Sequence, residues 1–151
     1  MTITYDTRRP STAQLHALYD SVGWSLYLRP GLLDACLDSS TWFECAWSSA
    51  ADGVQEKADG ASEKLVGLVR VVGDDASIAY VQDLLVDPDH QRAGVGSRLL
   101  DDAGQRFSHV RQLVLLTDDD AQTRAFYESA GLVAAGVLGC VAYLRPPTSM
   151  I

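Results

Sequence analysis

The residues whose types and spacing most clearly suggest a binding site form one loop, residues 87–97. This loop reads Asp87-Pro88-Asp89-His90-Gln91-Arg92-Ala93-Gly94-Val95-Gly96-Ser97. Gly94 and Gly96 let the backbone approach a ligand closely, and the free N–H groups of the helix that begins here can point at an anion. The pattern therefore predicts a cradle for a pyrophosphate. An isolated GxG also has a simpler interpretation, in which the two glycines only shape a tight turn.

Two other phosphate-binding motifs compete for this loop. The dinucleotide-binding fingerprint GxGxxG needs a third glycine where the chain has Leu99, and the loop falls late in the chain. A P-loop needs Gly-Lys followed by Ser or Thr, and no such sequence follows the glycines. Neither motif is present.

A second segment that could do chemistry is the predicted helix that ends at Gly131. Residues 118–120, three aspartates, supply its N-cap and a negative charge at its start. Tyr127 then places a phenol next to Phe126 on this helix. Taken alone, Tyr127 is most simply an amphipathic aromatic residue of the core.

Together the two segments resemble the GNAT acyltransferase superfamily. Leu84-Leu85-Val86 and Asp-Pro, followed by Gln91-x-x-Gly94-x-Gly96 and an amphipathic helix, resemble its acetyl-CoA-binding signature [QR]-x-x-G-x-[GA]. Residues 124–132 resemble its A-x-F-Y-x-x-x-G-F segment, and the element order over residues 2–144 fits as well. The chain departs from the pattern at Asp120, where many members have a cofactor-contacting Asn, and at Leu132, which replaces Phe.

The resemblance implies acetyl-CoA as the acyl donor, held mostly by backbone groups. Strand residues would bond the pantetheine amides like an added strand, and these are Leu84, Leu85 and Val86. Loop amides would hold the pyrophosphate, and these belong to Gln91, Arg92, Ala93, Gly94, Val95, Gly96 and Ser97. The remaining cofactor contacts implied by the resemblance are Asp120, Phe126 and Tyr127.

Direct transfer to an amine needs the neutral amine, which is only about one molecule in 10³ at pH 7 for an alkyl ammonium with a pKa of about 10.4. A base must take that proton, and an acid must protonate the departing thiolate. The resemblance assigns the acid to Tyr127. Asp83 is the candidate base, although strand alternation and a β-bulge leave its direction open, so that a structural role is equally favoured. Glu44 is the weaker candidate.

The acceptor side is less well marked in the sequence. Trp24 and Tyr27 lie in a helix-to-helix connector that covers the acceptor site in this family, so they could form an aromatic wall for a cationic or apolar amine. The alternative is that both cap the core. Glu44, on an earlier strand, is a further candidate on this side.

Hydrophobic periodicity predicts the elements that position these residues. The expected helices cover residues 12–22, a segment from Pro30 through Leu37, residues 94–108, and residues 118–130. The expected strands cover residues 41–47, 64–72, 79–86, 113–116, 133–137 and 140–144, with 113–116 buried on both faces. The predicted fold class is α/β, a GNAT-like single domain over residues 1–151 with a mixed, largely antiparallel central sheet flanked by helices on both faces. Residues 48–63 are expected to be a flexible hairpin loop and residues 145–151 a C-terminal tail.

Composition narrows the functional classes. The formal net charge of −8 disfavours a nucleic-acid surface and slightly favours a cationic substrate. No apolar run approaches the roughly 20 residues of a membrane-spanning helix, and no signal-peptide pattern is present, so a cytoplasmic protein is expected. Cys36, Cys45 and Cys140 are expected to be reduced thiols, and no metal site is suggested. The three histidines are expected at the surface or on helices without partners: His16, His90 and His109.

The sequence thus predicts an N-acetyltransferase that moves an acetyl or other short acyl group from acetyl-CoA to a primary amine of a small molecule or peptide. The main alternative is a non-catalytic acyl-CoA-binding sensor or regulatory module, which would not need an acid at Tyr127. A nucleotide-binding protein that uses the same loop is a third interpretation. Because many relatives are dimers, the resemblance also implies a homodimer, with the last two predicted strands as the contact.

Overall fold

The computed structural model describes residues 2–49 and 63–145, and its chain divides into two compact units, residues 1–116 and 117–151, which we describe separately. The strands of the first unit are β1 (Thr2–Asp6), β2 (Trp42–Ser49), β3 (Glu63–Gly73), β4 (Ile78–Val86) and β5 (Gln112–Val114). Its helices are α1 (Thr12–Ser21), η1 (Ser25–Leu28), α2 (Leu32–Asp38), η2 (Pro88–His90) and α3 (Val95–Arg106). The second unit contains α4 (Ala121–Ser129) and η3 (Ala135–Leu138).

The strands form one sheet in the order β1-β2-β3-β4-β5. The first four are antiparallel, and only β4 and β5 run parallel. The predicted α/β class with a mixed, largely antiparallel sheet is therefore confirmed. The sequence analysis missed β1, a short polar strand in which only Ile3 and Tyr5 pack against the core.

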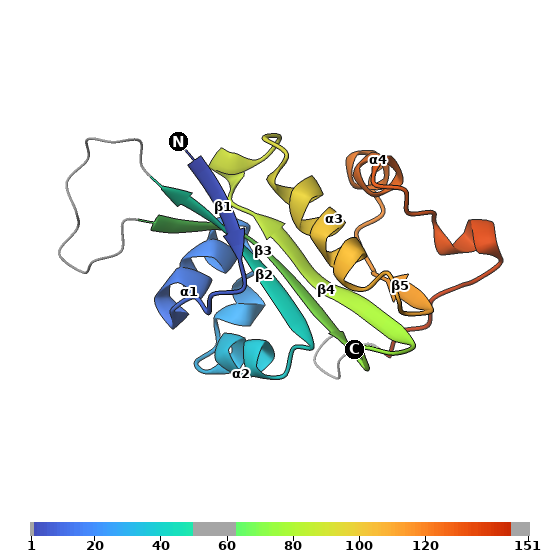
Figure 1. Ribbon diagram of the computed structural model, residues 1–151, viewed down its shortest axis with the longest axis horizontal. Coiled ribbons are helices and arrows are strands. Elements are labelled where there is room, and N and C mark those ends of the chain that lie inside the picture. Colours follow the sequence, from blue (N-terminus) through green and yellow to red (C-terminus); the bar gives the residue numbers. More distant parts are fainter. Residues whose placement is uncertain (1, 50–62, 146–151) are drawn as a thin grey trace. The chain divides into compact units, whose positions relative to one another are not determined.

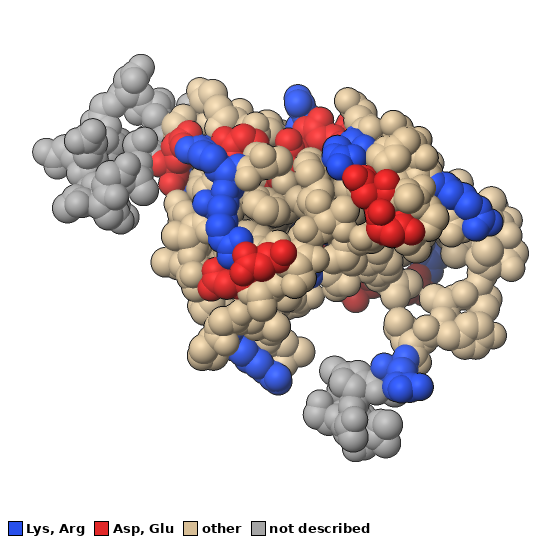
Figure 2. Space-filling view, turned by 60° about the horizontal axis from the view of Figure 1, so that its bottom comes forward, with Lys and Arg blue, Asp and Glu red and all other residues tan. Residues whose placement is uncertain are grey.

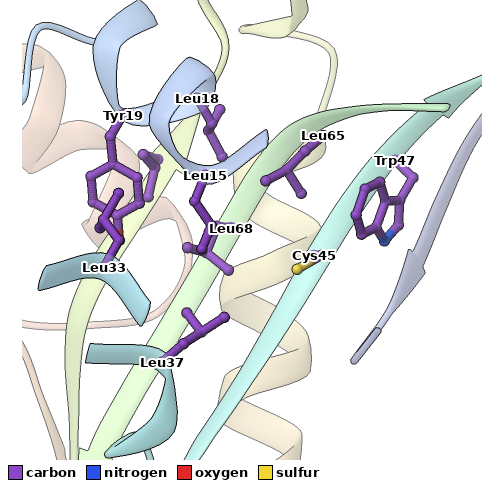
Figure 3. Packing of buried hydrophobic residues seen from close by; sticks show 10 residues of the cluster. Leu15, Leu18, Tyr19, Leu33, Leu37, Cys45, Trp47, Leu65 and Leu68 are labelled. Carbon is purple, nitrogen blue, oxygen red and sulfur yellow. The ribbon is translucent and has the colours of Figure 1, made fainter. Parts of the chain in front are cut away.

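Helices cover both faces of the sheet, with α1 and α2 on one face and α3 on the other (Figure 1). On the first face, Leu15 and Leu18 of α1 lie above Leu65 and Leu68 of β3, and all four are at most 3% exposed (Figure 3). On the second face, α3 lies so close to β3 that a Cβ on Gly67 would be 3.0 Å from Val95 Cγ1. The two layers of apolar contacts fix the sheet from both sides.

The helix ends follow the predicted cap chemistry. The Ser11 side chain accepts a hydrogen bond from the Gln14 backbone N–H, and Gln14 Oε1 accepts one from the Ser11 backbone N–H, which is the predicted capping box. Both α2 and α3 instead begin after a glycine in the left-handed conformation, Gly31 at φ 74° and Gly94 at φ 83°. A glycine is favoured at such a position because a Cβ would crowd the backbone.

A β-bulge in β4 decides which way Asp83 points. Val71 pairs with Val81 and Arg70 pairs with Asp83, so Gln82 is the extra residue. Simple alternation would place Asp83 on the α3 face with Val81. The bulge turns its side chain to the α1 face instead, next to Tyr19.

Several expectations from the sequence are wrong. The predicted strands 133–137 and 140–144 are absent from the described chain, which forms η3 there, followed by a left-handed Gly139. An apolar run alone cannot separate a strand from other compact structure, and two glycines interrupt this one. Residues 113–116 form only the short β5 and are not buried on both faces, since Val114 is 36% and Leu116 46% exposed. Of the predicted loop, 50–62 lies outside the described residues, as does 146–151 of the predicted tail.

Candidate functional site

Where the cofactor was predicted to bind, one edge of β4 has no strand partner among the described residues. The short β5 pairs with β4 only from Ile78 to Tyr80. The predicted residues 84–86 pair with β3 on one side, and the part of the chain that the structure describes places no strand on their other side. Backbone N–H and C=O groups on that edge are thus available to an extended ligand, as in β-strand addition.

Side chains around this edge are engaged in the core. Leu84 and Val86 pack on the α3 face, and Leu85 packs on the opposite face. The Gln91 side chain reaches back and donates a hydrogen bond from Nε2 to the Val86 carbonyl oxygen at 3.1 Å. This arrangement leaves the backbone of the strand end, rather than its side chains, for a ligand.

The glycine loop carries the chain from this edge into α3. Arg92 and Gly94 both have positive φ angles, 59° and 83°. The first hydrogen bond of α3 joins Arg98 N to Gly94 O at 3.0 Å, so the preceding N–H groups, those of residues 95–97, have no acceptor within the helix. A Cβ on Gly94 would meet no atom within 4 Å, so the space beside it is open. The 12-residue helix adds its dipole to this anion-binding geometry.

A buried carboxylate anchors the loop, and the sequence analysis did not find it. Asp87 accepts hydrogen bonds from Lys64 Nζ at 2.8 Å and from the Asp89 backbone N–H at 3.1 Å, and it lies 3.1 Å from His90 Nδ1. Burial acts to raise the pKa of Asp87, but the bonds to Lys64 and His90 outweigh it and hold the pKa below its usual value. His90 was expected at the surface without a partner, which is wrong. His109 likewise has a partner in Asp75, at 3.0 Å from the Asp75 carbonyl oxygen.

A cavity of about 440 Å³ opens on the α1 side of the bulge in β4. Its lining comes from the connector after α1 and from the bulge, and the lining residues are Gly23, Trp24, Ser25, Leu26, Tyr27, Gln82 and Asp83. Trp24 and Tyr27 stack with ring centroids 5.9 Å apart and an interplanar angle of 27°. The structure therefore brings together three residues predicted for the acceptor side and the chemistry: Trp24, Tyr27 and Asp83.

Asp83 is the centre of a buried hydrogen-bond network. Its Oδ2 accepts from Arg70 Nε at 2.6 Å and from the Tyr19 hydroxyl at 2.8 Å, and its Oδ1 accepts from the Tyr27 hydroxyl at 3.0 Å. Burial and the neighbouring carboxylate both raise the pKa of Tyr19 and of Tyr27, so both phenols keep their protons. Burial acts to lower the pKa of Arg70, but the Asp83 carboxylate more than compensates. Three donors thus surround a carboxylate that solvent does not reach, with 0% of its side chain exposed.

The structure does not bring Glu44 to this cavity. Glu44 lies on the α3 face of β2, where burial first and Asp102 second raise its pKa to about 7, while Arg98 acts in the opposite direction. The cavity is on the other face of the sheet, because its aromatic residues pack against the α1 and α2 layer. Glu44 therefore has no contact with Trp24 or Tyr27 through which it could act on the same ligand.

The predicted acid Tyr127 lies on α4 in the second unit. Asp120 caps this helix, accepting from the Thr123 backbone at 2.9 Å and from its hydroxyl at 2.6 Å. The Asp120 carboxylate is thus committed to the cap, and these bonds lower its pKa. Tyr127 packs edge-to-face on Phe126, with the two ring centroids 5.0 Å apart. Burial raises the pKa of the Tyr127 phenol.

Surface charge and the remaining side chains suggest no other chemistry. On the face shown in Figure 2, basic side chains lie beside acidic ones. Ion pairs of the described residues include Arg9 with Asp38 at 2.6 Å. Within residues 2–49 and 63–145, no cluster of histidine, cysteine and carboxylate side chains has the arrangement of a metal site. None of the described helices is long and apolar enough to span a membrane.

Comparison with known proteins identifies the relatives of this chain. Residues 54–145 match the family model described as acetyltransferase (GNAT) domain. The chain is 32% identical over 130 residues to GCN5-related N-acetyltransferase 2, chloroplastic, of Arabidopsis thaliana, a match that covers 80% of this chain and 49% of that protein. A match to a protein of Gibberella zeae, 39% identical over 57 residues, covers 36% of this chain and 32% of that protein. The chain therefore spans less than half the length of either curated relative.

Solved structures give the same result for the fold. A GNAT-family acetyltransferase from Streptococcus pneumoniae has a TM-score of 0.74 at 28% identity, and the match covers 97% of this chain and 98% of that one. The N-acetylglutamate synthase of Neisseria gonorrhoeae, solved with coenzyme A and N-acetyl-glutamate, has a TM-score of 0.59 at 17% identity, covering 85% of this chain and 28% of that one. At that identity the second match concerns the fold alone.

Proposed function

Since this chain belongs to the GNAT family of acetyltransferases, we propose that it transfers an acetyl group from acetyl-CoA directly to a primary amine. The observation that carries the proposal is the continuous backbone surface formed by the unpaired edge of β4 and the free N–H groups at the start of α3. Such a surface suits a ligand with amides followed by a pyrophosphate. The coenzyme A bound to the gonococcal relative supports the same donor.

The residues that would hold the donor follow from this surface. Residues 84–86 offer backbone groups to the pantetheine amides, and residues 91–97 offer N–H groups to the pyrophosphate. Asp87, tied to Lys64 and His90, keeps the loop in place beneath them. Acetyl-CoA supplies the thioester that the amine attacks. Asp120 is better explained as a helix cap than as a cofactor contact.

Tyr127 is the proposed acid for the departing thiolate. Burial raises the pKa of its phenol above the usual value of 10.0, so it carries a proton at physiological pH and can give it up. The aromatic neighbour Phe126 holds the ring in place. A phenol in this state fits an acid and not a base.

The amine must lose its proton before it attacks, and Asp83 does not serve as a directly contacting base. Its side chain is 0% exposed, and its oxygens face Arg70, Tyr19 and Tyr27, so an amine in the cavity has no direct access to the carboxylate. We propose that solvent in the open cavity takes the proton. Asp83 then acts as a positioning residue that fixes the Tyr27 hydroxyl at the cavity wall.

Calorimetric titration with acetyl-CoA, coenzyme A and ATP, followed by thiol release with a panel of amines, tests this function. We expect both coenzyme A ligands to bind without competition from ATP, and thiol release to depend on the amine. Acetyl-CoA binding without turnover on any amine would favour the non-catalytic sensor. Binding of ATP in place of coenzyme A would favour the nucleotide-binding interpretation and would overturn the proposal.

A further inference from the structure

The hydroxyl of Tyr27 can only accept a hydrogen bond from a ligand in the cavity. A phenol has one proton to donate, and Tyr27 donates its proton to Asp83 Oδ1 at 3.0 Å. Asp83 is itself held by Arg70 and Tyr19, so this orientation is fixed from the buried side. The Tyr27 oxygen also accepts a long hydrogen bond from Gln82 Nε2 at 3.4 Å, and the acceptor capacity that remains favours a ligand that brings an N–H group.

The cavity has no positive charge to offer a ligand. Of its lining residues only Asp83 is ionisable with a charge at neutral pH, and among the residues that the structure describes no Lys or Arg belongs to the lining. Arg70 lies behind Asp83. Its guanidinium donates hydrogen bonds to that carboxylate and, at longer distances, to the Cys36 carbonyl and the Ser40 hydroxyl. A carboxylate or phosphate brought into this space would find neutral donors such as Ser25 and Gln82 but no cationic partner, and it would lie near the Asp83 carboxylate.

The rest of the cavity lining is mainly aromatic and apolar. Trp24 is 36% exposed and stacks on Tyr27, while Tyr19 closes the cluster from below with its ring centroid 5.0 Å from that of Tyr27. Leu26, 66% exposed, extends the apolar lining. A volume of about 440 Å³ is within the range of pockets that bind small organic ligands.

From these contacts we infer the class of the acceptor, an inference that rests on the proposed function. The cavity selects a primary amine carried on an apolar or aromatic body, with its N–H directed at the Tyr27 oxygen, and it discriminates against amines that also carry a carboxylate or a phosphate. Aralkylamines fit this description, whereas α-amino acids and amino-sugar phosphates do not.

A pair of acceptors that differ by one group provides the test. 2-Phenylethylamine and phenylalanine share the ring and the primary amine, and only the second carries a carboxylate. We expect kcat/KM for acetyl transfer to be roughly 100-fold higher for 2-phenylethylamine, because the extra carboxylate is desolvated near Asp83 without a cationic partner. A kcat/KM for phenylalanine that equals or exceeds the value for the amine would overturn the inference.

Two matched variants locate the effect. Tyr27→Phe removes the acceptor oxygen and keeps the ring, so we expect KM for 2-phenylethylamine to rise about tenfold, the usual loss for one hydrogen bond to a charged or polarised group, with acetyl-CoA affinity unchanged. Tyr5→Phe makes the same change on β1, outside the lining residues, and should leave KM unchanged. Equal KM values for Tyr27→Phe and the unmodified chain would remove the hydroxyl from acceptor recognition.

Binding measurements separate this inference from the proposed function. The two acceptors are titrated calorimetrically into the full chain with coenzyme A present, which requires no acetyl transfer. Tighter binding of 2-phenylethylamine than of phenylalanine supports the inference even if no amine is acetylated. Equal binding, tighter binding of phenylalanine, or no binding of 2-phenylethylamine would each overturn it, whatever the transferase assay shows.

Discussion

The loop after β4 and the cavity beside β4 adjoin the same strand but offer different groups to the ligands proposed for them. The loop, residues 87–97, presents backbone N–H groups, its conformation depends on Gly94, and the Asp87 side chain anchors it to Lys64 and His90. The cavity presents side chains, and its central contact joins four residues far apart in the sequence: Tyr19, Tyr27, Arg70 and Asp83. A site built from backbone groups can be recognised from a short stretch of sequence, whereas a side-chain network depends on tertiary contacts.

The difference also predicts how each site responds to substitution. Backbone groups remain when a side chain is changed, so only residues that set the loop conformation should matter there. The cavity network is buried and charged, so one change should damage both the fold and the site.

The largest expected effect is the loss of stability in Asp83→Asn. This change leaves Arg70 charged and unpaired in the interior, which we expect to lower the free energy of unfolding by about 3–5 kcal/mol. Urea unfolding followed by circular dichroism measures it. The double variant Arg70→Met with Asp83→Asn should lose less than the sum of the two single variants, because it removes both charges. Additive losses would mean that the network does not act as a unit.

A smaller effect, mainly on cofactor binding, is expected for Gly94→Val. The change opposes the positive φ of 83° and fills open space beside the free N–H groups. We expect acetyl-CoA to bind roughly 100-fold more weakly, the loss of one or two charge-assisted hydrogen bonds, as measured by calorimetric titration.

Gly31 provides a matched control for backbone strain. It precedes α2 as Gly94 precedes α3, its φ is 74°, and its Cβ would also meet no atom within 4 Å. Gly31→Val should therefore cost about the same stability, roughly 1–2 kcal/mol, with unchanged acetyl-CoA affinity. Equal affinity losses in both variants would mean that strain alone explains the effect and that the loop assignment is wrong.

The features that could be predicted from the sequence are those that depend on local chemistry, and the features that depend on tertiary contacts could not be predicted. The capping box at Ser11, the strand through Val86 and the helix after Gly94 depend on local chemistry, and all three predictions are confirmed. The direction of Asp83 depends on an extra residue at Gln82, which alternation cannot reveal because it arises from pairing with β3. The pairing of Asp87 with Lys64 joins residues 23 positions apart and left no local signal.

The C-terminal region shows the limit of apolar patterns. Residues 133–137 and 140–144 are rich in Val, Leu and Ala, yet they contain η3 rather than strands. Composition indicates that a segment is apolar but not which partner it has, and strand formation needs a partner. The homodimer that the resemblance implied stays a prediction, without the strands that were expected to form its contact.

Tyr127→Phe should affect turnover and leave acetyl-CoA binding unchanged. Removing the phenol removes the proposed acid, and we expect kcat to fall about 100-fold, within the usual range for acid–base catalysis. Because burial raises the pKa of this phenol above 10.0, the unmodified chain should keep its acid as pH rises from 7 to 9, so the difference should persist across that range. Steady-state thiol release measures it.

Tyr143 supplies the control for that substitution within the same unit, since its side chain is 91% exposed. Tyr143→Phe should leave both kcat and KM unchanged. If Tyr127→Phe behaves in the same way as Tyr143→Phe, the acid must be sought elsewhere.

The smallest expected effect concerns Glu44, which lies on the α3 face of the sheet and does not line the cavity. Its pKa is raised to about 7 from an ordinary 4.5, first by burial and then by Asp102, with Asp6 adding to the shift and Arg98 opposing it. Between these two pH values the folded chain holds a proton that the unfolded chain has released. Stability should therefore fall as pH rises through this window, by about 1–2 kcal/mol once partial exposure to solvent is allowed for.

Glu44→Gln removes this titration, so the loss of a charged group should increase stability at high pH rather than decrease it. At pH 5 the variant and the unmodified chain should unfold at similar urea concentrations, whereas at pH 8 the variant should be the more stable, because it carries no charge beside Asp102. Its kcat/KM for amines should be unchanged, since Glu44 does not line the cavity. If kcat/KM changes while the pH dependence of stability does not, Glu44 takes part in binding the acceptor. That result would contradict the placement of Glu44 and the cavity on opposite faces of the sheet.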